Sequence, residues 1–409
     1  MNNQKQTQGK FTRNTRFNHS KRSSGFHGRP SRFTAKSNRP KSQTLDISSF
    51  INRAVASRVP EKAFTPKYLF TDFKLNPVLL RSIIQKKYIQ PTPIQDKIIP
   101  SVLEGKDMVG LANTGTGKTA AFLIPLIERV LRDQRGQILI VTPTRELALQ
   151  IEEELESITR QMRIYSTVCV GGEYIGIQVR KLKRKNNFII GTPGRLIDLV
   201  NRKILKLNGT HTVVLDEADR MLDMGFIKDI RLLVSHTPEE RQTLCFSATM
   251  SKKIEILVGD FLKNPEIVSV KTTEMPENIE QDVVHIRNLD KVDVLQGLLQ
   301  NNEFKKVLVF GRTRHGVENL SRKLTQRGIK TESIHSDKTQ MQRKRALLNF
   351  KNNRVQALVA TDVAARGLDI DNITHVINYE IPETFDDYIH RIGRTGRGTQ
   401  RGKALTFVN

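Results

Sequence analysis

Residues 108–119 read MVGLANTGTGKT, in which a short apolar run leads into a glycine-interrupted turn that ends in Lys-Thr. Between a strand and a helix such a turn usually holds phosphate, because its glycines let backbone N–H groups face phosphate oxygens and the helix adds its positive N-terminal dipole. Lys118 would reach the β- and γ-phosphates, and Thr119 would be a ligand of Mg²⁺. The predicted phosphate-binding turn consists of Ala112, Asn113, Thr114, Gly115, Thr116, Gly117, Lys118 and Thr119, with Ala112 where the general pattern has glycine.

A second stretch, VVLDEAD at residues 213–219, places two carboxylates directly after an apolar strand. In an open α/β sheet, ligands bind beyond the carboxyl ends of the strands. Asp216 is suited to the Mg²⁺ shell, and Glu217 is suited to polarising a water molecule for attack on the γ-phosphate. Two adjacent acids can also form a solvated loop or a helix cap. The strand leading straight into them favours a nucleoside triphosphatase.

From about residue 66 onward, short apolar runs alternate with segments of helical periodicity. This pattern is typical of parallel strands with helices on both faces. The polar stretch at residues 271–282 contains a proline and interrupts the alternation. We therefore predict an α/β fold with parallel-sheet domains at residues 66–270 and 282–409, a linker at 271–281, and a connecting segment at 46–65. The expected strands are DMVGLA, QILIVT, YSTVCV, NFIIGT, HTVVLD and QTLCFS in the first domain, and VVHIRN, KVLVFG, TESIHS, VQALVA, THVINY and KALTFVN in the second.

The net charge of +25 makes nucleic acid the first partner to consider. Residues 1–44 contain eleven Lys or Arg, no Asp or Glu, and no Leu, Ile or Val. Because such a segment cannot bury enough apolar surface to offset its ordering entropy, residues 1–45 are predicted to form a disordered basic tail. Four phenylalanines interleaved with arginines favour non-specific RNA binding by this tail. The alternatives are a solubilising leader and a mitochondrial transit peptide, although no amphipathic helix is visible.

Other classes of protein fit the sequence less well. No apolar stretch reaches the roughly 18 residues of a membrane span. Cys169 and Cys245 stand alone in apolar runs, so they are expected to be buried core residues and not a disulfide or a zinc site. The chain is expected to be cytoplasmic. No segment has heptad character long enough to suggest a dimer, so a monomer is expected.

Together these stretches closely resemble the DEAD-box RNA helicases, whose family name is spelled by residues 216–219. The likeness extends over about residues 66–409 and includes many separate motifs in the family's order. It implies two RecA-like domains, ATP and Mg²⁺ as cofactors, and RNA as single strand or short duplex as the partner. The resemblance also implies that Gln95, in the stretch YIQPTPIQ, recognises the adenine edge and that Phe70 stacks on its ring.

The second domain is implied to complete the ATP site. Asp369, in TDVAARGLDI, would bind the ribose hydroxyls. Arg394 and Arg397, in HRIGRTGR, resemble arginine fingers that stabilise charge on the γ-phosphoryl group. The resemblance further implies that the nucleotide state is coupled to the RNA site through Ser247, Thr249 and His390.

RNA is expected to contact both domains through stretches that match the family's RNA-binding motifs. Arginines in these stretches can grip phosphates, while glycines and threonines let backbone and hydroxyl groups approach sugar oxygens. Such contacts carry no base-sequence information, and reading 2′-hydroxyls would distinguish RNA from DNA. The implied RNA-binding residues are Pro143, Thr144, Arg145, Gly172, Thr192 and Arg195 in the first domain, and Arg343 and Thr361 in the second.

Three features depart from the family's pattern. Lys87 and Ser336 stand where family members usually have glycine. Family members generally continue with a helix after the strand that matches KALTFVN, where this sequence ends at Asn409. The lysine at position 87 leaves the conformation of the turn before the adenine-recognising stretch open. The serine at position 336 is expected to be tolerated.

The resemblance implies a cycle in which ATP and RNA together close the cleft between the domains. One strand of a short duplex is bent and the other is released, and hydrolysis reopens the cleft. Unwinding is expected to be local, non-processive and nearly independent of RNA sequence. Two alternatives stay open: a DNA translocase, which DNA-stimulated hydrolysis would indicate, and a non-enzymatic RNA annealer that works through its basic tail.

Overall fold

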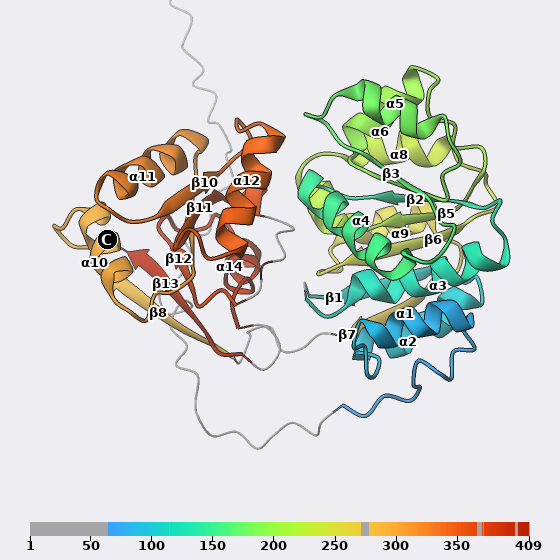
Figure 1. Cartoon of the computed structure of the whole chain (residues 1–409), viewed down its shortest axis with the longest axis horizontal. Helices are drawn as coiled ribbons and strands as arrows, with labels where there is room; N and C mark the ends of the chain where they lie inside the picture. The colour runs from blue at the N-terminus through green and yellow to red at the C-terminus, as the bar shows by residue number, and fades with distance from the viewer. Residues whose placement is uncertain are drawn as a thin grey trace, which may run out of the picture. The chain divides into compact units, whose positions relative to one another are not determined.

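The structure is a computed structural model that describes residues 64–113, 115–270, 278–365, 370, 372–396 and 400–408. Two parallel sheets, each with helices on both faces, form two α/β domains (Figure 1). The predicted basic tail, nearly all of the connecting segment and most of the predicted linker lie outside the described residues.

The first sheet has seven strands in the order β3-β4-β2-β5-β6-β1-β7, and all neighbouring strands are parallel. Its strands are β1 (Met108–Ala112), β2 (Gln137–Val141), β3 (Ser166–Cys169), β4 (Phe188–Gly191), β5 (Thr210–Leu215), β6 (Gln242–Ser247) and β7 (Glu266–Val270). Its helices are α1 (Pro77–Gln85), α2 (Pro93–Leu103), α3 (Lys118–Arg132), α4 (Arg145–Thr159), α5 (Ile175–Leu182), α6 (Pro193–Asn201), α7 (Ala218–Asp223), α8 (Ile227–Ser235) and α9 (Lys252–Phe261).

Each strand of this sheet except the edge strand β7 contributes to two hydrophobic cores, because successive side chains point to opposite faces. In β2, Ile138 and Ile140 pack in the core beneath α1–α4, whereas Leu139 and Val141 pack in the core beneath α6–α9. Burial on both faces accounts for the nearly continuous apolar runs of the sequence. Cys169 and Cys245 are free and buried, as predicted.

The second sheet has six parallel strands in the order β10-β11-β9-β12-β13-β8. Its strands are β8 (Ile279–His285), β9 (Val307–Gly311), β10 (Thr331–Ile334), β11 (Ala357–Thr361), β12 (His375–Asn378) and β13 (Gly402–Val408). Its helices are α10 (Lys291–Gln300), α11 (Arg314–Gln326), α12 (Gln340–Lys351), α13 (Asp362–Ala365) and α14 (Phe385–Ile392). Helices α10 and α11 cover one core of this domain, and α12 and α13 cover the other.

All twelve strands that the sequence predicts are present, but two details differ. Strand β7 was not predicted, because only one of its five residues is buried and it therefore lacks the apolar run of an interior strand. Strand β8 begins at Ile279, inside the range predicted as linker, because its hydrogen-bonded partner β13 extends the pairing over seven residues.

Candidate nucleotide-binding and nucleic-acid-binding sites

The phosphate-binding turn connects β1 to α3. Gly115 and Gly117 have φ angles of 84° and 92°, which lie in the left-handed region that favours glycine. Lys118 is the first residue of α3, and its Nζ donates a hydrogen bond to the carbonyl of Ala112 at 2.8 Å. Ala112 is the last residue of β1 and needs no glycine. Thr114 lies outside the described residues.

Gln95 and Thr92 hold this turn from α2. The side chain of Gln95 donates from Nε2 to the carbonyl of Gly117 at 3.1 Å, and its Oε1 accepts from the backbone N–H of Thr92 at 3.0 Å. The Thr92 hydroxyl donates to the carbonyl of Thr116 at 2.9 Å. A Cβ atom on Gly117 would lie 2.6 Å from Gln95 Nε2, so this contact requires glycine. The residue predicted to recognise adenine is therefore bound to the phosphate turn itself.

Phe70 precedes α1 in the chain and is only 3% exposed. Its ring packs at 6.1 Å from the ring of Phe73 and is stacked at 6.3 Å on that of Tyr88. Stacking of Phe70 on adenine stays a prediction. Lys87, where the family usually has glycine, has a φ of 61°. Lysine thus adopts the backbone that glycine would adopt at lower cost, and the turn is retained.

The acidic pair follows β5. Asp216 and Glu217 are 2% and 4% exposed, and the backbone N–H of Glu217 donates to Asp216 Oδ1 at 3.0 Å. Burial raises the pKa of Asp216 to about 6, with Lys118 lowering it and the Glu217 carboxylate raising it further. Glu217 itself has a φ of 52°, an uncommon backbone for a residue with a side chain. A buried carboxylate beside a lysine is a suitable environment for a cation bound with phosphate.

The group that such a site would take is Mg²⁺, held by the Thr119 hydroxyl and the Asp216 carboxylate. Within the described ranges there is no cluster of three or more His, Cys, Asp or Glu that could hold a metal ion. A single carboxylate is consistent with Mg²⁺, which is usually bound by one or two carboxylates together with phosphate and water. The raised pKa of Asp216 shows the cost of an unneutralised charge there, and the residues fit the ion.

Asp219, the last residue of the acidic stretch, connects it to the SAT stretch after β6. Its Oδ2 accepts from the backbone N–H groups of Ala248 at 2.8 Å and Thr249 at 3.2 Å. Burial alone would raise the pKa of Asp219, but the charges of Lys118 and Arg220 and the Ala248 N–H hold it below its usual value. Ser247 donates from Oγ to the carbonyl of Thr249 at 2.7 Å. Asp219 was not among the predicted site residues, although its place in the tetrapeptide at residues 216–219 was a signal.

The predicted RNA-binding residues of the first domain gather after three other strands. Pro143, Thr144 and Arg145 follow β2, Gly172 follows β3, and Thr192 and Arg195 follow β4. The guanidinium of Arg145 lies against the glycine pair, since a Cβ atom on Gly172 would be 2.1 Å from Arg145 Nη1. The residues that line one hollow include Pro143, Thr144, Arg145, Thr192 and Arg195 from two of these groups, together with Gly171, whereas Gly172 is not among them.

In the second domain, Thr361 ends β11 and Arg343 lies in the first turn of α12. His390 lies in the last turn of α14, and Arg394 follows this helix, with its Nε donating to the carbonyl of His390 at 3.2 Å. Asp369 and Arg397 lie outside the described residues. Ser336 has a φ outside the left-handed region, so glycine is not required there.

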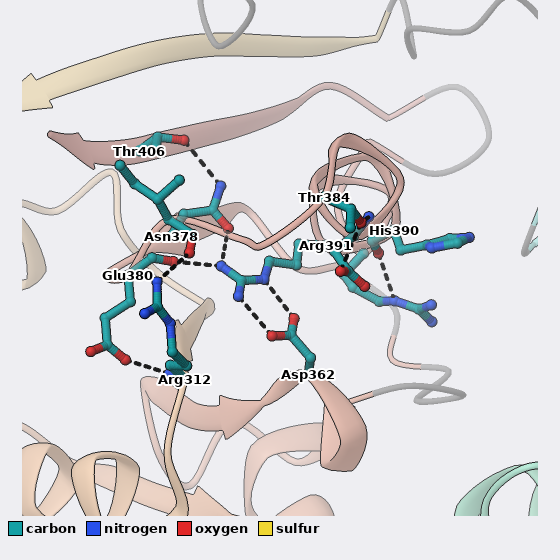
Figure 2. A network of polar contacts seen from close by, with 11 residues as sticks. Arg312, Asp362, Asn378, Glu380, Thr384, His390, Arg391 and Thr406 are labelled. Atoms are coloured by element: carbon teal, nitrogen blue, oxygen red, sulfur yellow. Dashed lines mark hydrogen bonds and ion pairs between the residues drawn. The ribbon is translucent and has the colours of Figure 1, made fainter. Parts of the chain in front are cut away.

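Arg391, which was not among the predicted site residues, joins these elements. Figure 2 shows its guanidinium between Asp362, Asn378 and Glu380. It donates from Nε and Nη2 to the two carboxylate oxygens of Asp362 at 2.6 and 2.7 Å, and from Nη1 to the Glu380 carbonyl at 2.6 Å and to Asn378 Oδ1 at 3.2 Å. The Phe310 ring lies 5.1 Å from its central carbon. Four of the five N–H donors of this buried side chain are thus used.

Comparisons with known proteins agree with this arrangement. The family model for DEAD/DEAH box helicases matches residues 92–257, and that for the helicase conserved C-terminal domain matches residues 290–399. The chain is 47% identical over 343 residues to the ATP-dependent RNA helicase CshA of Listeria monocytogenes, and the match covers 83% of this chain and 66% of that protein. It is 47% identical over 341 residues to the DEAD-box ATP-dependent RNA helicase CshA of Bacillus subtilis, covering 83% and 69%. The chain thus spans about two thirds of the length of these relatives.

Solved structures show the same fold. Dbp5 of S. cerevisiae bound to RNA and ADP BeF3 is similar with a TM-score of 0.75 and 31% sequence identity, and the match covers 83% of this chain and 89% of that one. The two family models follow one another along about two thirds of the chain, one over each of the two parallel sheets. The chain belongs to the DEAD-box family of RNA helicases.

Proposed function

We propose that this chain is an ATP-dependent RNA helicase that hydrolyses ATP in response to RNA and locally remodels short duplexes without processive movement. The observation that carries the proposal is the order of the strands in the first sheet and of the stretches that follow them. The stretches assigned to RNA follow β3, β4 and β2, which are adjacent. The next three strands are β5, β6 and β1, and they are followed by the acidic pair, the coupling stretch SAT and the phosphate-binding turn. One edge of one sheet would therefore hold both ligands side by side.

The proposed roles follow from the contacts. Lys118, already held over the turn by Ala112, would move to the β- and γ-phosphates, and Thr119 and Asp216 would hold Mg²⁺. When bound, the ion would neutralise phosphate charge and orient the phosphates for displacement. Glu217 would orient and deprotonate the attacking water. Asp219, bonded to Ala248 and Thr249, would transmit the state of this site to the SAT stretch.

The second domain is proposed to supply Arg394 and Arg397 to the γ-phosphoryl group and Asp369 to the ribose. Hydrolysis would then require the domains to approach each other, and RNA would favour the same closed state. Since both ligands would bind that state better, each would raise the affinity for the other by the same factor. Gln95 and Phe70 are proposed to select ATP.

The proposal also covers the RNA affinity of the basic tail, the oligomeric state and the location in the cell. The basic tail is proposed to add RNA affinity that does not depend on sequence, and the chain is proposed to act as a monomer in the cytoplasm. In the part of the chain that the structure describes, no helix is both long and apolar enough to cross a membrane.

The test is steady-state ATP hydrolysis without nucleic acid, with single-stranded RNA and with DNA of the same sequence. Wild type and Glu217→Gln are measured side by side, with nucleotide affinity as the check that the variant is folded. We expect stimulation by RNA alone and its loss in the variant. Equal stimulation by DNA would indicate a DNA translocase. Rates that RNA does not change would show that the two sites are uncoupled and contradict the proposal.

A further inference from the structure

Helix α5 buries one residue fully, and that residue carries an amide. Gln178 is 2% exposed, whereas Ile175, Val179 and Leu182 of the same helix are only partly buried against the core. Burying a polar side chain without hydrogen-bond partners is unfavourable, and an aliphatic residue would fill this place at lower cost. The amide must therefore make contacts that an aliphatic residue cannot.

Both ends of the Gln178 amide are bonded. Its Nε2 donates to the carbonyl of Val170 at 2.9 Å, and its Oε1 accepts from Nη1 of Arg195 at 3.0 Å. Val170 directly precedes the pair Gly171-Gly172 after β3, and Arg195 lies in the first turn of α6 after β4. One buried side chain thus ties together two of the three loops that are proposed to bind RNA.

The same contact orients the Arg195 guanidinium without neutralising it. A guanidinium has five N–H donors in a fixed fork, and Gln178 occupies one of them. Asp198 lies 4.0 Å from Arg195 Nε, at the outer limit of an ion pair. Phosphate binding depends on the positive charge, because each neutralised phosphate releases counterions. A carboxylate in place of the amide would hold the guanidinium as well but would cancel its charge.

The glycine pair is also in contact with Arg145, whose Nη2 would lie 3.0 Å from a Cβ atom on Gly171. The loop after β3 is therefore connected to two arginines, directly to Arg145 and through Gln178 to Arg195. This spacing is set inside the first domain and needs no ligand.

We propose that Gln178 is a positioning residue of the RNA site, which holds the Gly171-Gly172 loop and Arg195 at a fixed separation so that both engage one RNA strand. This inference rests on the proposed function. It adds that the site needs the amide to be uncharged, so that Arg195 keeps its positive charge, as well as to form its two hydrogen bonds.

The test measures the dissociation constant of a short single-stranded oligouridylate by fluorescence anisotropy, with a non-hydrolysable ATP analogue, over a series of salt concentrations. The variants are Gln178→Leu, Gln178→Glu, Arg195→Ala and the two double variants with Arg195→Ala. Gln85, exposed near the end of α1 in the same domain, provides the matched controls Gln85→Leu and Gln85→Glu. Nucleotide affinity reports whether each variant is folded.

We expect Gln178→Leu to weaken RNA binding about tenfold with an unchanged salt slope. Gln178→Glu should also weaken binding, and its slope of log affinity against log salt should be shallower by about 0.7, the value for one lost phosphate contact with a single strand. In the Arg195→Ala background both changes should weaken binding by less than they do in the wild-type background. The part of each effect that acts through Arg195 is then already lost, and only the contact with Val170 remains to be broken.

Each result decides a different point. Wild type that does not bind RNA would overturn the proposed function and this inference with it. Wild type that binds, with Gln178 variants that bind equally well, would overturn the inference alone. Additive losses in the double variants would show that Gln178 only stabilises the loop. If Gln178→Leu loses nucleotide affinity as well, the salt slope of Gln178→Glu decides the question.

Discussion

The guanidinium of Arg391 forms two parallel hydrogen bonds with the carboxylate of Asp362, from Nε at 2.6 Å and from Nη2 at 2.7 Å. Arg391 lies in α14, and Asp362 directly follows β11. The helix that carries His390 and leads to Arg394 is therefore fixed to the strand that ends in Thr361 (Figure 2). Residues proposed to contact nucleotide and RNA in the second domain share this one support.

Replacing Arg391 by Met should destabilise the second domain by about 3 kcal/mol, because it leaves the Asp362 carboxylate without its partner. Arg391→Lys keeps the charge but not the fork, and we expect a loss of about 1.5 kcal/mol. Calorimetric unfolding of the full chain measures both, with the exposed Arg401→Lys as control. Losses that are additive with that of Asp362→Asn would show that the pair does not act as a unit.

The two acids Asp216 and Asp219 should shift stability with pH in opposite directions. The pKa of Asp216 is raised from 3.8 to about 6. The stability that comes from the protonated carboxyl is therefore fully present below about pH 4 and is lost as the pH rises through about 6. Without Mg²⁺ and nucleotide, Asp216→Asn should therefore raise the unfolding free energy at pH 7, by up to about 3 kcal/mol. At pH 4 the variant and wild type should be equally stable.

Asp219→Asn is the matched comparison. The pKa of Asp219 is lowered in the folded protein, so the stability that the ionised carboxylate contributes is present at neutral pH and is lost on acidification. This variant should be less stable than wild type at pH 7, with a difference that narrows as the pH falls. Thermal unfolding across this pH range checks both variants. Two variants that change in the same direction would contradict the environments described above.

Gly115 and Gly117 have nearly equal φ angles but different surroundings, so they separate backbone strain from contact with Gln95. A Cβ atom on Gly115 meets nothing within 4 Å, whereas one on Gly117 lies 2.6 Å from Gln95 Nε2. Gly115→Ala should cost only the strain of a left-handed residue, about 1–2 kcal/mol. Gly117→Ala should lower the affinity for nucleotide about ten times more than Gly115→Ala does. Equilibrium binding of a fluorescent ATP analogue to both variants measures this difference. Equal affinities would mean that Gln95 does not hold the turn.

The basic tail should appear in the salt dependence of RNA binding. If about six of its cations engage single-stranded RNA, the slope of log affinity against log salt is steeper by about four. Deleting residues 1–45 should remove this increment and leave the RNA-free ATPase rate unchanged. The isolated tail, tested for strand pairing without ATP, is the control for an annealing activity. An unchanged slope would exclude a binding role for the tail.

The sequence was sufficient for the strands and for the residue types at the sheet edge, because both depend on local patterns. Apolar runs identified β1 and β5, and the glycine and acidic stretches after them defined the nucleotide site. The sequence was not sufficient to predict contacts between segments that are distant along the chain. The bond from Asp219 to Ala248 and that from Arg391 to Asp362 each join residues 29 positions apart, and both depend on which strands are neighbours.

Two further residues show the same limit. Gln178 lies in an ordinary amphipathic helical pattern, and its significance appears only when β3 and β4 lie side by side. Phe70 is named by its spacing from the YIQPTPIQ stretch, but spacing does not report that Phe73 and Tyr88 pack against its ring. A motif specifies which residues are near a site, and packing decides which of their atoms remain available.

The position of β8 at the edge of the second sheet affects how this domain is made in the cell. Among the described strands of this domain, β8 is the first to be synthesised, and it pairs with the sheet through β13, the last of them. The roughly 120 residues between them take about 6–24 s to translate at 5–20 residues per second. During that time the middle strands can assemble while β8 waits without a partner. Strand β13 must therefore be synthesised before β8 can pair with the sheet.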